Sequence, residues 1–452
     1  MYKKIQRIHF IGIGGIGMSA IAEVLSRHGY RVSGSDLGKN ESVRHLESLG
    51  IQVFQGHAGS HIAGAELVVF SSAILADNPE LVAAKQGEIP SIPRAEMLAE
   101  LMRLKTGIAV AGAHGKTTTT SLISVALVDA GLDPTIIVGG RVDHLGGANA
   151  RFGRSEFLVA EADESDGSFS KLSPCLAVVT NIDREHMDYY GTMTRLRNRF
   201  LSFVNKVPFY GLVVLFGDDP YVKLMRPRIT RRKKTFGFGE RNDYRIVEYQ
   251  CTPAGTACEV RIGRERELLR LQIPGRHNAL NALATLAVTD ELSIPRKQAI
   301  ESMGNFGGVR RRFQQRGEKG GVTFIDDYAH HPSEITATLS AARERFPQGK
   351  VRVIFQPHRF SRVEDLFDRF SSCFKDCDQL CLVDIYPAGE KPIPGIHSEV
   401  LAENIERQGS VLVKYCSSQT LALETCLLSA KPGDVILTLG AGDLPNVYKE
   451  LF

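Results

Sequence analysis

The chain has 452 residues, of which 43% are hydrophobic and 23% are charged. These fractions are close to the average of globular domains, so they argue against a disordered chain, a collagen-like repeat or a coiled coil. The formal net charge of +4 is too small over this length to predict a nucleic-acid or membrane surface. At roughly 150 residues per domain, the length predicts about three domains.

The patterns of cysteines and apolar residues indicate the cellular compartment of the protein. Eight cysteines are scattered along the chain, which is typical of a reducing compartment. The nearest group, Cys373, Cys377 and Cys381, lacks the further ligands of a metal site, so we expect buried free thiols. No apolar stretch reaches the ~18 residues of a membrane span. The glycine pattern of the N-terminal apolar run fits a βα turn better than a signal peptide, and we expect a cytoplasmic protein.

The first segment, residues 1–106, opens with a strand, a glycine-rich turn and a helix. The expected elements are a strand over 7–13, a helix over 18–28 and a second strand over 31–36. Glycines let the backbone approach a diphosphate, and an acid at the end of the second strand receives a ribose hydroxyl. A nucleotide diphosphate is therefore expected at Gly14, Gly15, Ile16, Gly17 and Asp36. A glycine-rich turn without a ligand is the alternative.

A further strand over 66–70 places two serines at its carboxyl end. Ser71 and Ser72 follow this strand directly. Ligands bind at the carboxyl ends of strands in an open parallel sheet, so these serines are candidate ligand contacts. A polar loop or a helix cap is the alternative.

The second segment, residues 107–306, contains a shortened phosphate-binding loop between a strand over 108–111 and a helix. Backbone N–H groups of such a loop cradle phosphates, its lysine neutralises them, and the next hydroxyl ligates Mg²⁺. Val110 stands where the general motif has its first glycine, so the loop is a variant. The residues expected to contact phosphates are Gly112, Ala113, His114, Gly115, Lys116, Thr117 and Thr118.

Acidic residues and one histidine follow the next strands. A strand over 156–160 ends in an acidic run that begins at Glu161, and such a cluster is costly unless cations or donors neutralise it. A solvated acidic loop is the alternative, although the apolar run before it favours a cleft. A strand over 176–181 leads to His186. We expect this strand to neighbour both the strand before Thr117 and the strand before Glu161, which favours a metal or phosphate role for His186.

The remaining elements complete an α/β pattern. Residues 231–234 are read as a solvated turn, and residues 274–282 as a helix start in which Asn278 either faces a base or caps the helix. In the third segment, residues 307–452, we expect strands over 322–326, 350–356, 376–385 and 435–439 and a helix beginning at Pro332. Arg359 and Arg362 are candidates for a substrate carboxylate, because guanidinium forks suit carboxylates.

Together these motifs resemble those of the ATP-dependent Mur ligases, which attach amino acids to a UDP-linked muramyl precursor of bacterial peptidoglycan. The resemblance rests on GIGGIGMSAIAEVL, SSAI, GAHGKTTTT, EADESDGSF and the run from His186 to Tyr189, and it covers almost the whole chain. It implies an α/β fold of three domains. These are a Rossmann-like UDP-sugar domain (1–106), a P-loop ATPase-like central domain with a mostly parallel sheet (107–306) and a Rossmann-like amino-acid-binding domain (307–452).

The resemblance also implies roles for individual residues. Lys116, Glu161 and His186 would be catalytic, with Thr117 and Glu161 on one Mg²⁺ (or Mn²⁺) and His186 on a second. ATP would be held through His277, Asn278, Asn281, Arg312 and Asp327. Tyr328, His330, His358, Arg359 and Arg362 would lie near the substrates.

Two features favour the family members that add L-alanine to UDP-N-acetylmuramate. Residues 195–201 contain no lysine, where several other members carry a lysine carbamate, and residues 357–362 have the alanine-type motif. The expected reaction passes through an acyl phosphate and releases ADP and phosphate, in a monomer or weak homodimer. The alternatives are a recycling ligase that adds a murein tripeptide, and an NAD-dependent oxidoreductase. The oxidoreductase leaves Lys116, Glu161 and His186 without a role.

Overall fold

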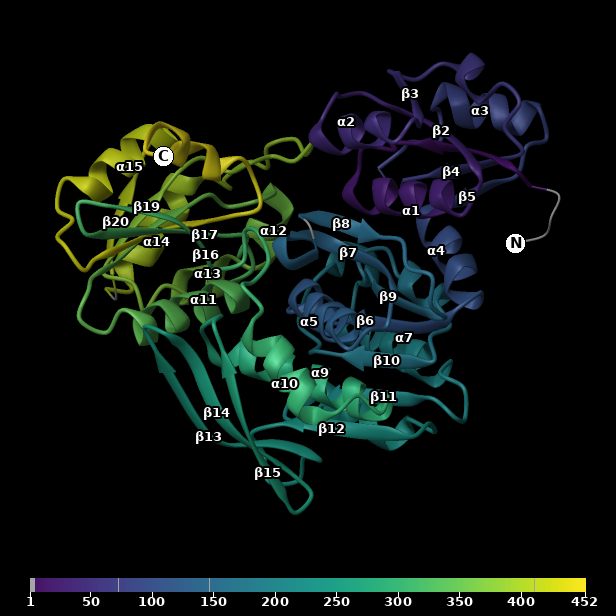
Figure 1. The fold of residues 1–452 in the computed structure, drawn as a ribbon. Helices are drawn as coiled ribbons and strands as arrows, with labels where there is room; N and C mark the ends of the chain where they lie inside the picture. The colour runs from purple at the N-terminus through teal and green to yellow at the C-terminus, as the bar shows by residue number, and fades with distance from the viewer. Residues whose placement is uncertain (1–4, 72, 146, 410) are drawn as a thin grey trace. The chain divides into compact units, whose positions relative to one another are not determined.

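A computed structural model describes residues 5–71, 73–145, 147–409 and 411–452. The chain divides into two compact units, which are described one at a time. The first unit comprises Met1–Val247, Val260–Glu267 and Leu280–Met303, and the second comprises Glu248–Glu259, Leu268–Ala279 and Gly304–Phe452. Figure 1 labels the helices and strands.

The N-terminal sheet in the first unit has five parallel strands in the order β3-β2-β1-β4-β5. This is the strand order of a Rossmann-like half. The chain adds β2 and β3 on one side of β1 and then β4 and β5 on the other side. The strands are β1 (Arg7–Ile11), β2 (Arg31–Asp36), β3 (Gln52–Gln55), β4 (Leu67–Phe70) and β5 (Ser91–Pro93). The helices are α1 (Ile16–Arg27), α2 (Glu41–Ser48), α3 (Pro79–Gln86) and α4 (Arg94–Arg103), with the short helix η1 (Gly59–Ile62).

The central sheet has ten strands in the order β15-β14-β13-β12-β11-β10-β6-β9-β7-β8. Its core strands β6 (Thr106–Ala111), β9 (Phe157–Glu161), β10 (Leu176–Val179) and β11 (Leu212–Phe216) are parallel and read as continuous apolar runs. The others are β7 (Thr135–Val142), β8 (Ala148–Arg151), β12 (Lys233–Gly237), β13 (Tyr244–Thr252), β14 (Gly255–Ile262) and β15 (Glu265–Leu271). β8 runs antiparallel to β7.

Helices of the central segment follow these strands. They are α5 (Lys116–Asp129), α6 (Met187–Tyr190), α7 (Met193–Asn205), α8 (Pro220–Met225), α9 (Arg276–Glu291) and α10 (Arg296–Gly304). The turn predicted over 231–234 is wrong in its second half, because Lys233 and Lys234 begin β12. One continuous hydrophobic cluster joins buried residues of the N-terminal and central sheets, so the first unit has a shared core.

The second unit is built on a six-stranded sheet in the order β16-β17-β21-β18-β19-β20. Its strands are β16 (Gln314–Lys319), β17 (Val322–Asp327), β18 (Val351–Phe355), β19 (Gln379–Leu382), β20 (Leu412–Tyr415) and β21 (Val435–Leu439). Only the edge strand β16 is antiparallel to its neighbour among these described pairs. The helices are α11 (Pro332–Arg345), α12 (Phe360–Asp365), α13 (Phe367–Ser372), α14 (Ser398–Arg407) and α15 (Gln419–Leu427).

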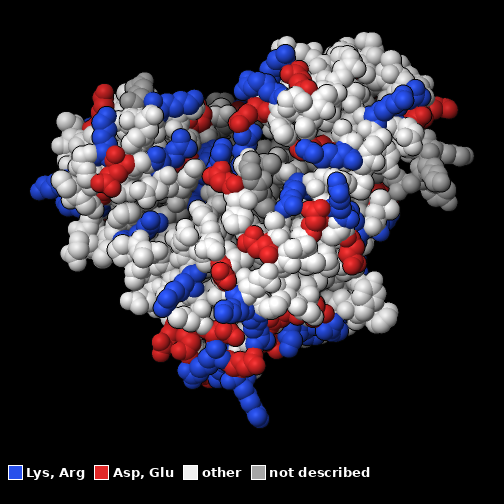
Figure 2. Space-filling view, in the orientation of Figure 1, with Lys and Arg blue, Asp and Glu red and all other residues white. Residues whose placement is uncertain are grey.

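The predicted α/β architecture with mostly parallel sheets is confirmed, with local differences. The strand expected over 376–385 is shorter, since only residues 379–382 pair with neighbours. Cys373, Cys377 and Cys381 are buried free thiols, as predicted. Among the described residues, none of the helices combines the length and the apolar character that crossing a membrane demands. Figure 2 shows basic and acidic side chains interspersed over the face that it draws, in keeping with the small net charge.

Candidate active site

The turn between β6 and α5 has the conformation that a phosphate-binding loop requires. Gly112 (φ +141°) and Gly115 (φ +80°) adopt backbone angles that other residues rarely take. A side chain at Gly112 would also collide with Thr180, whose Oγ1 would lie 2.0 Å from the added Cβ. The His114 N–H donates to Asn181 Oδ1 (2.8 Å), and the Thr180 hydroxyl donates to the His114 carbonyl (2.6 Å). The residues that follow β10 therefore fix the loop.

Lys116, the first residue of α5, folds back over this loop. Its ammonium group donates to the carbonyl oxygens of Gly112 (2.6 Å) and Ala113 (3.0 Å), and to Glu164 Oε1 (2.8 Å). Burial alone would lower the pKa of Lys116, but neighbouring glutamates, Glu164 foremost, raise it above its ordinary value. The lysine is therefore a charged group held at the loop. Thr118, two residues further, is buried in α5.

Thr117 and Glu161, two predicted metal ligands, are in direct contact. The Thr117 hydroxyl donates to Glu161 Oε2 (3.0 Å), and the same oxygen accepts the Gly139 N–H (2.9 Å). Glu161 ends β9, which runs parallel to β6. A hydroxyl and a carboxylate oxygen are ligands that Mg²⁺ prefers. The structure thus brings these two residues together at the carboxyl ends of neighbouring strands.

The third predicted ligand, His186, belongs to a group with Glu164 and Glu185. Its Nε2 lies 3.7 Å from Glu185 Oε2 and 4.0 Å from Glu164 Oε1. One ligand atom from each of the three residues lies within 4.8 Å of the others. Glu164 Oε2 is buried and has no hydrogen-bond partner among the described residues. A buried carboxylate oxygen left in this way requires an explanation, and a cation would supply one.

The charge around Glu164 agrees with this reading. Burial raises the pKa of Glu164 to about 8, and the charges of Asp163 and Glu185 add to the effect while Lys116 opposes it. The charged form of Glu164 is therefore unfavourable unless a cation lies nearby, and Lys116 is the cation that the structure supplies. Sequence reasoning had singled out the acidic run but not Glu164 or Glu185. The only available signals were the density of the run and the acid beside His186.

One prediction about these strands is wrong. We expected β10 to neighbour both β6 and β9, but the order is β10-β6-β9, so β6 separates the other two. The reason is topological, because the chain adds strands on both sides of β6, which makes its carboxyl end a switch point. Ligands of open α/β sheets bind at such points. The phosphate-binding loop accordingly lies between the loop after β9 and the loop after β10.

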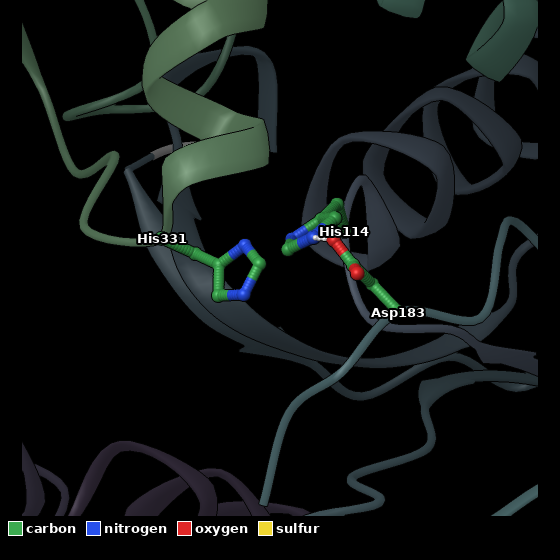
Figure 3. A group of neighbouring side chains, drawn as sticks. All are labelled: His114, Asp183 and His331. Atoms are coloured by element: carbon green, nitrogen blue, oxygen red, sulfur yellow. Dashed lines mark hydrogen bonds and ion pairs between the residues drawn. The ribbon is translucent and has the colours of Figure 1, made fainter. Parts of the chain in front are cut away.

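His114 and Asp183 form a further pair beside the loop (Figure 3). His114 Nε2 lies 3.0 Å from Asp183 Oδ2, in the segment that follows β10. The pair connects the predicted phosphate-binding loop to the segment that carries His186. His331, drawn in the same figure, belongs to the second unit, where it caps α11 and takes part in a capping box with Glu334.

The N-terminal glycine turn forms between β1 and α1 as predicted. The Gly14 N–H donates to Asp36 Oδ2 (2.8 Å), and the Gly38 N–H donates to Asp36 Oδ1 (3.1 Å). Asp36 thus braces the glycine turn with one oxygen and the loop after β2 with the other, and its predicted contact with a ribose stays a prediction. The Ile16 carbonyl accepts from Asn149 Nδ2 (2.7 Å), which ties the start of α1 to the central segment.

The glycine turn and the acidic strand end share one cavity. A cavity of about 290 Å³ is lined by Gly15, Ile16, Gly17 and Ser71 from the N-terminal segment and by Glu161 from the central segment, among others. Predicted diphosphate contacts and a predicted metal ligand therefore face a common space. Ser72, the other predicted serine, lies outside the described residues.

In the second unit, Asp327 ends β17 as a buried acid. Its carboxylate accepts the N–H groups of Phe313 (2.6 Å) and Ala329 (2.7 Å). Burial raises the pKa of Asp327 to about 6, although Arg312 and both N–H donors oppose the rise. The Arg312 guanidinium lies over the Tyr328 ring (5.3 Å to the centroid). The predicted ATP contacts Arg312 and Asp327 are therefore neighbours.

The predicted substrate residues of the second unit also gather. The rings of Tyr328 and His330 are 5.4 Å apart, and those of His330 and His358 are 5.9 Å apart. The Arg362 guanidinium donates to the His358 carbonyl (3.1 Å). Burial, with His330 and the guanidinium of Arg362 nearby, lowers the pKa of His358 to about 3, so this imidazole is neutral.

Arg359 and Tyr386 complete this cluster. Arg359 has a strained backbone (φ +71°), an exposed side chain, and an N–H that donates to the Tyr386 carbonyl (2.9 Å). The Tyr386 ring stacks on His358 at 5.6 Å. Sequence reasoning missed Tyr386, because nothing in its local sequence distinguishes it from an ordinary loop tyrosine.

The helix start predicted over 274–282 is present as α9. The N-cap alternative for Asn278 is wrong, since Asn278 is the third residue of α9 and its Nδ2 donates to the Pro274 carbonyl (2.7 Å). Burial lowers the pKa of His277 to about 4, and Arg312 adds to the effect. Asn281 lies against the phosphate-binding loop, because a Cβ on Gly115 would approach its Oδ1 to 2.7 Å.

Models of protein families match almost the whole chain. The matches are Mur ligase family, catalytic domain, over residues 7–106; Mur ligase middle domain over 110–289; and Mur ligase, glutamate ligase domain, over 311–442.

Individual relatives agree with these matches. UDP-N-acetylmuramate–L-alanine ligase of Geobacter sp. (strain M21) is 51% identical over 99% of this chain and 97% of its own, and that of Geobacter sulfurreducens is 50% identical over 98% and 96%. The crystal structure of UDP-N-acetylmuramate–alanine ligase from Thermotoga maritima is 31% identical. It has a TM-score of 0.83 and covers 98% of this chain and 97% of that chain.

Proposed function

Because the chain belongs to the Mur ligase family, we propose that it joins L-alanine to the carboxylate of UDP-N-acetylmuramate, using ATP and releasing ADP and phosphate. The observation that carries the proposal is the arrangement of Lys116, Thr117 and Glu161 beside a cavity shared with Gly15 and Gly17. A phosphate-binding loop and an acceptor-binding turn that face one space are what phosphoryl transfer to an acceptor requires. The relatives that are half identical over nearly the whole chain carry this activity in their names.

Three segments divide the work in this proposal. Residues 1–106 bind the UDP-sugar, residues 107–306 bind ATP, and residues 307–452 bind the amino acid. We place the reaction in the cytoplasm, in keeping with eight free cysteines and an ATP co-substrate, and expect a monomer or weak homodimer.

The chemistry requires activation, because a carboxylate does not condense with an amine in water. A carboxylate oxygen of the acceptor attacks the γ-phosphorus of ATP, and ADP leaves, which gives an acyl phosphate. The L-alanine amine then attacks the acyl carbon. The tetrahedral intermediate loses phosphate and a proton, and an amide forms. The protein mainly positions three substrates and neutralises charge.

Lys116 and the loop amides supply much of that neutralisation. The loop of Gly112, Ala113, His114 and Gly115 would cradle phosphates through the N–H groups that Asn181 does not hold. The Lys116 ammonium would exchange its carbonyl partners for β- and γ-phosphate oxygens. Arg312 would neutralise the γ-phosphate. Each of these contacts strengthens as charge moves onto the transferred group.

The acidic groups fit divalent cations. Thr117 with Glu161 offers a hydroxyl and a carboxylate, while His186 with Glu164 and Glu185 offers an imidazole and a buried oxygen without a partner. Oxygen-rich donor sets of this kind suit Mg²⁺ or Mn²⁺. Two such ions would shield the attacking and leaving oxygens during phosphoryl transfer.

The remaining predicted residues would hold the other parts of the substrates. His277, Asn278, Asn281 and Asp327 would contact the adenosine of ATP. Gly14, Gly15, Ile16, Gly17, Asp36, Ser71 and Ser72 would bind the UDP-sugar. Tyr328, His330, His358, Arg359 and Arg362 would surround L-alanine, and a neutral His358 beside Arg362 leaves the arginine charge available for the amino-acid carboxylate.

Release of phosphate tests the proposal. The protein is incubated with ATP, Mg²⁺ and UDP-N-acetylmuramate, together with L-alanine, glycine, L-serine or the murein tripeptide. We expect fastest release with L-alanine and little with the tripeptide. No release with any small amino acid would overturn the proposal. The tripeptide alternative has a weaker basis, because murein peptide ligases from Psychrobacter arcticus and Neisseria meningitides are 21% and 28% identical to this chain, against 51% for the L-alanine ligase of Geobacter sp..

A further inference from the structure

Arg94 is the first residue of α4, and its side chain crosses to the start of α1. A Cβ built on Gly17 would lie 2.6 Å from Arg94 Nη1 and 3.4 Å from its Cζ. Because Gly17 has no side chain, the guanidinium can rest directly against the first turn of α1. Arg94 played no part in the sequence analysis, since it lies far along the chain from the glycine turn.

The guanidinium is held on one side and open on the other. Its Nη2 donates to Asp163 Oδ2 (2.9 Å). Nε and Nη1 have no hydrogen-bond partner among the described residues, and Nη1 is the atom that faces Gly17. A fork that is anchored through one nitrogen and open at the others is pre-oriented for a bidentate anion.

The charges that line the shared cavity indicate that a bound diphosphate would need this arginine. Among the described residues that line the cavity of about 290 Å³, Arg94 is the single Lys or Arg, while Glu161 and Asp163 are acidic. The start of α1 supplies only about half a positive charge. Gly15 caps it without a side-chain hydrogen bond, and its first turn contains no acid. A diphosphate placed there would face two carboxylates without any other cationic side chain of the cavity.

We propose that Arg94 binds the diphosphate of the acceptor substrate, with its guanidinium completing the site begun by the N–H groups of Ile16 and Gly17 at the start of α1. The inference rests on the proposed function, because it assumes a UDP-linked acceptor at this turn. It adds a cation to a site for which the sequence motif supplies only backbone groups. It also explains how the diphosphate can share one cavity with Glu161 and Asp163.

Binding of uridine ligands without ATP tests the assignment. Titration calorimetry compares UDP, UDP-N-acetylglucosamine and UDP-N-acetylmuramate on the full chain and on Arg94→Ala, Arg94→Lys and Arg103→Ala. Arg103 is the matched control, since it ends the same helix, is exposed and pairs with Glu100. Thermal unfolding checks that each variant is folded.

We expect Arg94→Ala to weaken all three ligands by a similar factor, about 10- to 100-fold. Arg94→Lys should recover part of the loss, because it keeps the charge but not the fork. Arg103→Ala should bind like the unmodified protein. Unchanged binding by Arg94→Ala would overturn the inference. So would a loss confined to UDP-N-acetylmuramate, because that would assign Arg94 to the acceptor carboxylate instead.

Gly17→Ala gives an independent check that retains the arginine. The added Cβ must displace the guanidinium, so UDP should bind several-fold more weakly, whereas Gly307→Ala, which meets nothing within 4 Å, should not change binding. UDP binding by Gly17→Ala as tight as in the unmodified protein would contradict the placement of Arg94. Failure of the unmodified protein to bind any uridine ligand would instead overturn the proposed function.

Discussion

Two buried glutamates of the first unit have pKa values that are shifted in opposite directions. Glu80, at the start of α3, is fully buried, and Glu164, after β9, is 2% exposed. Burial raises the pKa of a carboxyl group in both places. The pKa of Glu80 is nevertheless lowered to about 2, while burial raises that of Glu164 to about 8. The partners of each carboxylate, rather than its depth, explain the difference.

Glu80 has a complete set of donors. Its Oε2 accepts the Ser35 hydroxyl (2.6 Å), and its Oε1 lies 2.9 Å from His61 Nδ1 and accepts the Ala58 N–H (3.3 Å). His9 adds a further contact at 3.5 Å. A buried acid with such partners stabilises the fold of the N-terminal segment.

Glu164 has one strong partner, Lys116, and an oxygen without any among the described residues. Lys116 is also the residue that would leave it for phosphates. A buried carboxylate that lacks hydrogen-bond partners beside a phosphate-binding loop therefore indicates a site for exchangeable cations. A buried carboxylate with all its partners present, such as Glu80, indicates a structural role.

The largest effect on turnover is expected from removing Lys116, the partner that Glu164 would exchange for other cations. Lys116→Ala should lower kcat by about 1000-fold, because the γ-phosphate loses its cation. The fold should persist, since a Glu164 carboxyl with a pKa raised by burial can remain protonated. Phosphate release and circular dichroism measure the two outcomes. Lys171→Ala is the control, as Lys171 is half exposed and pairs with Glu96. Turnover within tenfold of normal would refute the role of Lys116.

Glu80 should make stability depend on acid. Because the pKa of Glu80 in the folded state is lowered to about 2 from 4.5, its contribution is present above pH 4.5 and is lost as the pH falls toward 2. The full contribution is about 3 kcal/mol. Urea unfolding of the unmodified protein and of Glu80→Gln between pH 6 and about pH 2, a range that includes both pKa values, measures it. Equal pH dependence of the two proteins would contradict this account of Glu80.

Glu164→Gln should weaken the binding of divalent cations. Removing one buried carboxylate from the group with Glu185 and His186 should lower Mn²⁺ affinity by about 10- to 100-fold. Electron paramagnetic resonance of Mn²⁺ with a non-hydrolysable ATP analogue measures this change directly. Glu66→Gln, a surface change in the N-terminal segment, is the control. Unchanged Mn²⁺ affinity would mean that the oxygen without a partner is not a cation ligand.

Asp36 is an intermediate case. Both of its carboxylate oxygens accept hydrogen bonds, as in Glu80, but its side chain is only partly buried. Asp36→Asn keeps one acceptor and loses a charge-assisted contact to the N–H of Gly14 or Gly38. We expect the free energy of unfolding to fall by about 1 kcal/mol and the affinity for UDP to weaken roughly fivefold. Calorimetry and thermal unfolding check both numbers, and unaltered UDP affinity would show that the brace is unimportant for binding.

Local sequence predicted the turns and strands well, because their determinants are local. Glycine patterns at 12–17 and 112–115 need positive φ or close approach, and apolar runs such as β6 and β21 are strands buried on both faces. The prediction failed where long-range pairing decides. Whether β10 is added beside β9 or on the other side of β6 depends on the direction in which the chain winds, which a single strand does not encode.

The candidate site shows the same division between local and long-range determinants. Lys116, Thr117 and Glu161 carry motif signals and come together as expected. Glu164, Arg94 and Tyr386 were missed, because each acquires its significance from a partner distant in sequence. A buried acid is recognisable only once its donors are known.

In the proposed reaction, the acceptor carboxylate is activated by phosphoryl transfer before the amine attacks. Oxygen-18 in the carboxylate of UDP-N-acetylmuramate tests this most directly, with the phosphate released during L-alanine ligation analysed by mass spectrometry. The account predicts that one labelled oxygen appears in the phosphate, because a carboxylate oxygen bonds to the γ-phosphorus and leaves with it. Unlabelled phosphate accompanying amide formation would contradict it.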